Sequence, residues 1–85
     1  MRVVTSPTFD KQFKKLSHKV QQQFKARLSL WLENSEHPTL RVHPLKGSLS
    51  GYWSMNISGD YRVIYYFQGD ETAVLALIGT HSQLY

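Results

Sequence analysis

Cysteine is absent from this chain of 85 residues, which excludes disulfides, thiolate nucleophiles and cysteine-based zinc sites. Long hydrophobic runs are also absent, and segments such as residues 73–78 fall far short of the roughly 20 residues that cross a bilayer. No signal-peptide pattern opens the sequence, so a cytoplasmic location without a membrane partner is expected. A chain of this length is expected to form a single domain over residues 1–85.

Acidic residues are scarce in the first part of the chain. Residues 1–32 contain seven Lys or Arg and one acid, Asp10, whereas residues 33–85 contain three basic and five acidic residues. The net charge is therefore +6 in the first segment and −2 in the second. This imbalance favours nucleic acid or an acidic protein as partner. The alternative interpretation is a helical surface of solvated lysines.

The first half of the chain is expected to form a short strand and two helices. Residues 2–5 are β-branched and strand-like, and Ser6 followed by Pro7 is a helix start signal. Ser17 marks the start of a second helix, which ends within residues 34–38. Apolar residues recur at helical spacing and are expected to face the core: Phe9, Phe13, Leu16, Val20, Phe24, Leu28, Trp31 and Leu32.

In the second half the apolar period changes to two, which is typical of strands. Strands are expected over residues 51–57, 61–67 and 72–78, with a tight turn at Ser58 and Gly59. The last strand is almost wholly apolar, which favours a central position with both faces buried. The order β-α-α-β-β-β predicts an α+β fold in which a helical hairpin packs on one face of an antiparallel sheet.

Alternation places two sets of side chains on opposite faces of this sheet. The set expected to face the helices is Trp53, Met55, Ile57, Val63, Tyr65 and Phe67. The set expected on the free face is Ser54, Asn56, Arg62, Ile64 and Tyr66. Arg62 is unusual in an apolar strand, because its guanidinium needs an anion or water. It is interpreted either as a structural ion pair with Asp60 or Glu71 or as a phosphate ligand.

Four histidines are candidates for acid–base chemistry. His18 lies at a helix junction and His37 in a loop, and both are interpreted as surface residues. His43 precedes a loop that carries Lys46, and His81 follows the last expected strand. No metal-ligand spacing, Ser-His-Asp order, P-loop or dinucleotide fingerprint is present, so no metal or cofactor is expected.

Three segments carry a resemblance to a known family. They are His43-Pro44-Leu45-Lys46-Gly47, Gly59-Asp60-Tyr61-Arg62-Val63-Ile64-Tyr65 and Gly79-Thr80-His81. With this order of elements, the chain resembles the RelE superfamily of bacterial toxins, and its ending Gly-Thr-His-x-x-Leu-aromatic is most similar to the YafQ branch. The resemblance implies an mRNA interferase, an endoribonuclease that cuts mRNA on the 70S ribosome. It also implies a cognate antitoxin protein as partner.

The resemblance further implies roles for individual residues. His43, Asp60 and His81 match catalytic positions of the YafQ pattern, and Tyr85 matches an aromatic residue that contacts mRNA. The 2′-hydroxyl of RNA can attack the adjacent phosphate, so such an enzyme needs an acid and a base but no metal. Histidine suits both tasks, and His43 and His81 are expected to divide them in an order that stays open. Asp60 is expected to orient an imidazole or to act as the base itself.

The other candidate residues are given binding roles. Arg62 and Lys46 are expected to stabilise the phosphorane, and Tyr85 and Tyr66 to stack on an unstacked base. The basic helical surface is expected to contact ribosomal RNA. An acidic antitoxin segment that folds on binding is expected to cover the same cationic surface and to exclude the ribosome.

Two departures from the YafQ pattern leave alternatives open. Asn56 stands in place of a histidine, and Leu77 in place of a phosphate-binding arginine. Both departures favour a ParE-like toxin, which shares the scaffold and acts against DNA gyrase without cutting RNA. His43, His81 and Tyr85 favour the ribonuclease, because a pure inhibitor needs no paired imidazoles. A third alternative is a catalytically inactive module that binds only the antitoxin.

Overall fold

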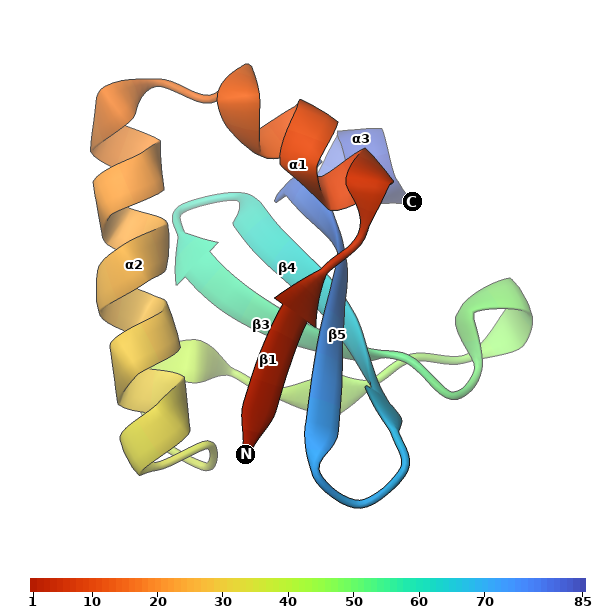
Figure 1. Cartoon of the computed structure of the whole chain (residues 1–85). Helices are drawn as coiled ribbons and strands as arrows, with labels where there is room; N and C mark the ends of the chain where they lie inside the picture. Colours follow the sequence, from red (N-terminus) through yellow and green to blue (C-terminus); the bar gives the residue numbers. More distant parts are fainter.

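The computed structural model describes all residues 1–85 and shows helices packed on a single sheet (Figure 1). The chain also has two short 3-10 helices, η1 (Pro38–Leu40) and η2 (Gly47–Leu49). None of the helices has the length and apolar character that crossing a membrane requires. The strands and α-helices in chain order are β1 (Arg2–Thr5), α1 (Pro7–Lys14), α2 (His18–Glu33), β2 (His43–Pro44), β3 (Trp53–Ser58), β4 (Tyr61–Gln68), β5 (Thr72–Thr80) and α3 (His81–Leu84).

The five strands form one sheet in the order β1-β5-β4-β3-β2. β2 to β5 pair antiparallel, as expected, but β1 runs parallel to β5, so the sheet is mixed rather than purely antiparallel. A short hairpin turn forces the two strands that it joins to run antiparallel. No such turn joins β1 and β5, which are far apart in sequence, so they can pair parallel. The prediction for the apolar strand is confirmed, because β5 lies between β1 and β4 with residues of both faces buried.

Both helix starts were predictable from local chemistry. The Ser6 hydroxyl oxygen accepts a hydrogen bond from the backbone N–H of Phe9 at 3.0 Å, and Ser17 does the same for Val20 at 3.2 Å. Ser6 also donates to the carbonyl of Ala76 at 2.7 Å, which ties the start of α1 to β5. The expectation for Leu32 is wrong: it is 52% exposed, because Trp31 takes the inward position at this end of α2.

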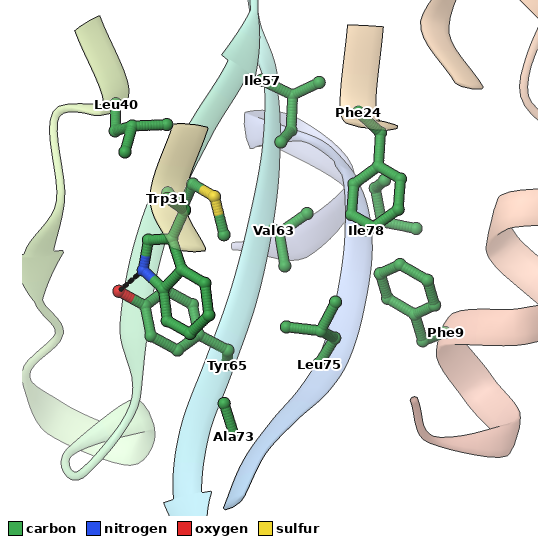
Figure 2. Packing of buried hydrophobic residues seen from close by; sticks show 11 residues of the cluster. Phe9, Phe24, Trp31, Leu40, Ile57, Val63, Tyr65, Ala73, Leu75 and Ile78 are labelled. Carbon is green, nitrogen blue, oxygen red and sulfur yellow. Dashed lines mark hydrogen bonds between the residues drawn. The ribbon is translucent and has the colours of Figure 1, made fainter. Parts of the chain in front are cut away.

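The core lies between the helices and one face of the sheet, where α1 packs on β5 and α2 on β3 (Figure 2). The predicted alternation is confirmed, and Phe67 lies at the rim, 46% exposed, with its ring stacked on Trp31. The Trp31 indole N–H donates to the Tyr65 hydroxyl at 3.2 Å, so both buried polar groups are paired. The buried cluster is Phe9, Phe24, Trp31, Leu40, Met55, Ile57, Val63, Tyr65, Ala73, Leu75 and Ile78.

The turn between β3 and β4 lies one residue later than expected. β3 continues to Ser58, and Gly59 and Asp60 form the turn. The pairing shifts between Asn56 and Ser58, so Ile57 is an extra residue that lengthens β3. Gly59 has a φ of 50°, in the left-handed region that glycine adopts without steric cost.

Candidate functional site

A pocket of about 290 Å³ gathers residues from separate parts of the chain. Its lining consists of His43 from β2, Leu45 from the following loop, Arg62 from β4, His81 from α3 and Tyr85 just after α3. Four of these five residues were singled out from the sequence. The structure thus brings two imidazoles, a guanidinium and a phenol to one hollow.

The strand register explains why these residues meet. His43 lies opposite Ser54, Ser54 opposite Ile64, and Ile64 opposite Leu77, which makes one row across β2, β3, β4 and β5. Arg62 is two residues before Ile64, so it lies on the same face in the next row. Leu77 makes the β5 end of the first row apolar. Arg62, in the next row, is the cation beside it on the free face.

His43 has a defined hydrogen bond at one ring nitrogen. Its Nδ1 lies 2.9 Å from the carbonyl oxygen of Arg41, and because a carbonyl can only accept, Nδ1 carries the proton. The lone pair of the neutral ring is then on Nε2. Arg41 has φ 48° and ψ 42°, and it is the one non-glycine residue with positive φ in residues 1–85. This left-handed backbone sets the direction of the carbonyl that holds His43.

His81 is positioned by the exit of β5. Its backbone N–H donates to the carbonyl of Asp60 at 3.1 Å, and the Thr80 N–H donates to the side-chain oxygen of Gln83 at 2.8 Å. A Cβ at Gly79 would lie 2.8 Å from that same Gln83 oxygen, so glycine permits this close approach. The His81 and Tyr85 rings lie 4.7 Å apart between centroids, His81 at the start of α3 and Tyr85 just after its end.

Arg62 has an unpaired donor. Its Nε is buried and makes no hydrogen bond, and the side chain forms no ion pair with Asp60 or Glu71. The interpretation of Arg62 as a structural ion pair is therefore wrong. A buried donor without a partner is costly, and charged groups cost the most.

Three other predicted residues lie outside this pocket. Lys46 lines a neighbouring hollow of about 510 Å³, which shares Leu45 and Tyr85 with the first. Asp60 contacts His81 through its backbone carbonyl, and its exposed carboxylate does not line the pocket. Tyr66 packs edge-on against Tyr52, with ring centroids 5.2 Å apart, and lines neither hollow.

Sequence reasoning missed the apolar walls and the backbone contact at this site. Leu45 and Leu84 line the hollows, but an isolated leucine in a loop or short helix gives no functional signal. The contact of the Arg41 carbonyl with His43 could not be predicted either, because it depends on the left-handed backbone at Arg41.

Asn56, which stands in place of a histidine of the YafQ pattern, has a local role. Its side-chain N–H donates to the carbonyl of Gly59 at 3.2 Å and so braces the β3–β4 turn. It does not line the pocket that contains His43 and His81.

No group of three or more His, Asp or Glu side chains is arranged to hold a metal ion in residues 1–85. The lysines of α1 and α2 and of the junction between them are all exposed, and we call them the basic helical surface: Lys11, Lys14, Lys15, Lys19 and Lys25.

Three comparisons place this chain among known proteins. YafQ from E. coli strain BL21(DE3) is 23% identical with a TM-score of 0.82, and the match covers 100% of this chain and 99% of that one. The toxin in the E. coli DinJ-YafQ complex is 27% identical over the same shares, with a TM-score of 0.81. A metal-bound toxin from Helicobacter pylori is 28% identical over the same shares, with a TM-score of 0.75. None of the curated proteins matches the chain.

The family assignment comes from a match over the full sequence. The family described as "Bacterial toxin of type II toxin-antitoxin system, YafQ" matches residues 1–85. The fold of the solved toxins agrees with this match across the whole chain. The chain therefore belongs to the YafQ family of type II toxin–antitoxin toxins.

Proposed function

We propose that this toxin is a ribosome-dependent endoribonuclease that cuts translated mRNA by general acid–base catalysis without a metal. The observation that carries the proposal is the pocket in which His43, Arg62 and His81 line one hollow beside Tyr85. Two imidazoles can supply the base and the acid that transesterification of RNA needs, and a guanidinium can stabilise the negative charge that develops.

The reaction uses the substrate's own nucleophile. The 2′-oxygen attacks the adjacent phosphorus and the bond from phosphorus to the 5′-oxygen breaks, which leaves a 2′,3′-cyclic phosphate and a 5′-hydroxyl. A base takes the proton of the 2′-hydroxyl, and an acid gives a proton to the departing 5′-oxygen. The number of protons is conserved, so one neutral and one protonated imidazole are sufficient.

The hydrogen bond at His43 favours one order of these roles. The Arg41 carbonyl holds Nδ1–H, so Nε2 of the neutral ring is free to accept the 2′-hydroxyl proton. We therefore assign the base to His43 and the acid to His81. Asp60 acts on His81 as a positioning residue, through the carbonyl that receives the His81 backbone N–H.

Arg62 stabilises the charge that develops on the phosphorane. Arg62 lines the pocket beside both imidazoles, where its guanidinium can give a phosphate oxygen charge-assisted hydrogen bonds. A cation in this place contributes most when charge develops in the transition state. Arg62 thereby replaces the arginine that the YafQ pattern has at Leu77.

The neighbouring hollow suits a nucleobase. It shares Leu45 and Tyr85 with the catalytic pocket and adds Leu49, Leu84 and Lys46. Aliphatic walls and one aromatic ring bind an unstacked base, while Lys46 attracts the backbone. Tyr66 lies farther along β4 and would contact only a nucleotide beyond this base.

The partners follow from charge and from a relative. The basic helical surface is suited to phosphates of ribosomal RNA, which lysines contact without reading sequence. A relative crystallised as the DinJ-YafQ toxin–antitoxin complex, and we propose that this toxin likewise has a cognate antitoxin. The antitoxin would cover the cationic surface and so exclude the ribosome.

Primer extension on a reporter mRNA in a translating extract tests the activity. Wild-type protein should produce cuts at ribosome-occupied codons, and His81→Ala should abolish them. His18→Ala is the matched control, because His18 is exposed at the start of α2 and outside both hollows. Full cleavage by folded His81→Ala protein would contradict the assignment. No cleavage by folded wild-type protein would instead direct the next assay to gyrase inhibition.

A further inference from the structure

A third hollow, which we call the arginine pocket, lies outside the catalytic machinery. Its volume is about 440 Å³. No acidic or aromatic residue belongs to its lining, and Pro38 is its one apolar side chain. The lining residues are Arg27, Pro38, Thr39, Arg41, Asn56 and Gly59.

Arg27 makes one hydrogen bond at the edge of this pocket. Its Nη1 donates to the carbonyl of Thr39 at 3.1 Å, so the guanidinium of α2 is attached to η1. That bond uses one donor of five, and the others have no acceptor within the protein. A guanidinium held in this way loses little side-chain entropy when it binds an anion.

Arg41 links the arginine pocket to the catalytic pocket. Its side chain lines the arginine pocket, while its carbonyl holds the Nδ1–H of His43. A left-handed conformation is unfavourable for arginine, and residues in such strained conformations cluster at functional sites. Asn56 provides a second link, because it lies directly opposite Arg62 in the pairing of β3 with β4.

We propose that the arginine pocket binds a phosphate of single-stranded RNA that neighbours the phosphate to be cut. The inference rests on the proposed function, in that RNA is the ligand. Two guanidinium groups without a carboxylate suit a phosphodiester, which accepts bidentate hydrogen bonds. An acidic peptide fits less well, because protein interfaces are built around an apolar core and Pro38 is the one apolar side chain in this lining.

The direct test is the salt dependence of RNA binding, measured by fluorescence anisotropy between about 50 and 200 mM salt. The probe is a short single-stranded RNA with 2′-O-methyl groups, which cannot be cut. Arg27→Gln keeps a donor for the Thr39 carbonyl, and Arg41→Asn introduces a residue that tolerates a left-handed backbone. One phosphate contact on a single strand is worth a slope of about 0.7, so the double variant should lose about 0.7 from the slope of log K against log salt, and each single variant a part of that amount.

Arg2→Gln is the matched control. It removes one arginine from β1, at the sheet edge opposite β2, and should leave the slope unchanged. Unchanged slopes for both pocket variants would overturn the proposal. Equal losses for Arg2→Gln and Arg27→Gln would also overturn it, because only diffuse charge would then be acting.

Further arms identify the source of the phosphate and separate this inference from the proposed function. Weaker binding by the pocket variants to ribosomes without mRNA, with oligonucleotide binding unchanged, would overturn the substrate-strand assignment in favour of ribosomal RNA. Weaker binding only to poly-glutamate would overturn RNA as the ligand. If the protein never cuts mRNA but the variants show the predicted slopes, the proposed nuclease is refuted and the arginine pocket is supported. If the protein cuts mRNA but the slopes are unchanged, the arginine pocket is refuted and the nuclease is supported.

Discussion

The helix-covered face of the sheet and its free face differ in how they treat buried polar groups. On the helix-covered face, the Trp31 indole N–H is paired with the Tyr65 hydroxyl. On the free face, Ser54 Oγ and Arg62 Nε are buried without partners, and they are the only such side-chain atoms in residues 1–85. Buried polar groups in stable cores are almost always paired, so the unpaired ones concentrate where the candidate active site lies. The difference separates a face whose buried polar groups stabilise the fold from a face that leaves such groups unpaired beside the candidate site.

The largest expected effect is on the free face and on activity. His43→Ala should lower cleavage about 100- to 10,000-fold, because general base catalysis has this magnitude. The side chain is exposed, so the free energy of unfolding should change by no more than about 0.5 kcal/mol. Quantified primer extension and urea unfolding measure the two quantities. A large loss of stability would show that the two faces are not separable in this way.

The next effect is on the helix-covered face and on stability. Leu75 is fully buried in the core, and Leu75→Ala should lower the free energy of unfolding by about 2–5 kcal/mol. Leu77→Ala is the matched control on the free face, where the side chain is half-buried and the loss should be smaller. Urea unfolding of the two variants compares the faces directly. Equal losses would contradict the assignment of the core to one face.

Tyr65→Phe should have a smaller effect that depends on pH. It leaves the Trp31 N–H unpaired and should cost about 1–3 kcal/mol at neutral pH. Burial raises the pKa of Tyr65 above its usual 10.0, although the hydrogen bond from Trp31 acts in the opposite direction. Because the native state favours the neutral phenol, this contribution to stability is complete below pH 10.0 and is lost as pH rises through the native pKa.

The measurement is the free energy of unfolding as a function of pH into the alkaline range. Wild-type protein should lose stability above pH 10.0, and Tyr65→Phe should lose less over the same interval. Parallel curves for the two proteins would mean that Tyr65 is not the group responsible.

The smallest expected effect has the opposite sign. Arg62→Leu removes the unpaired donor, and we expect the free energy of unfolding to rise by about 1 kcal/mol while cleavage is lost. Thermal melts paired with the cleavage assay measure this exchange of function for stability. Arg2→Leu, on β1, is a suitable control for added hydrophobic character. Destabilisation by Arg62→Leu would show that the guanidinium has a structural partner after all.

Local chemistry made much of the fold predictable, and long-range contacts account for the errors. The helix starts at Ser6 and Ser17 depend on hydrogen bonds three residues away, and strand alternation depends on neighbours. The parallel pairing of β1 with β5 depends on residues far apart in sequence, which no local pattern reports. The turn at Gly59 comes one residue late because β3 has a bulge, with Ile57 as its extra residue. The bulge leaves the alternation of apolar residues on either side unchanged, so the sequence pattern does not reveal it.

The candidate site was predictable in its residue types but not in its detailed geometry. His43 and His81 lie in motifs, and Arg62 was conspicuous as a charge within an apolar strand. The protonated nitrogen of His43 depends on the backbone of Arg41, and backbone direction leaves no trace in residue types. Asp60 was predicted through its carboxylate, but its contact with His81 is made by its main chain.

The parallel pairing of β1 with β5 has a consequence for the order of assembly. Ser6 bonds to Ala76 across 70 residues of sequence, and β5 leads directly into His81. The hairpins β3–β4 and β4–β5 pair strands that are neighbours in sequence and can form early. β1 can pair only after β5, the last strand to be synthesised, is available. The sheet is therefore incomplete on the ribosome that synthesises it until β5 has emerged. His81 follows β5 directly, so the two imidazoles of the candidate site can come together only after this last step.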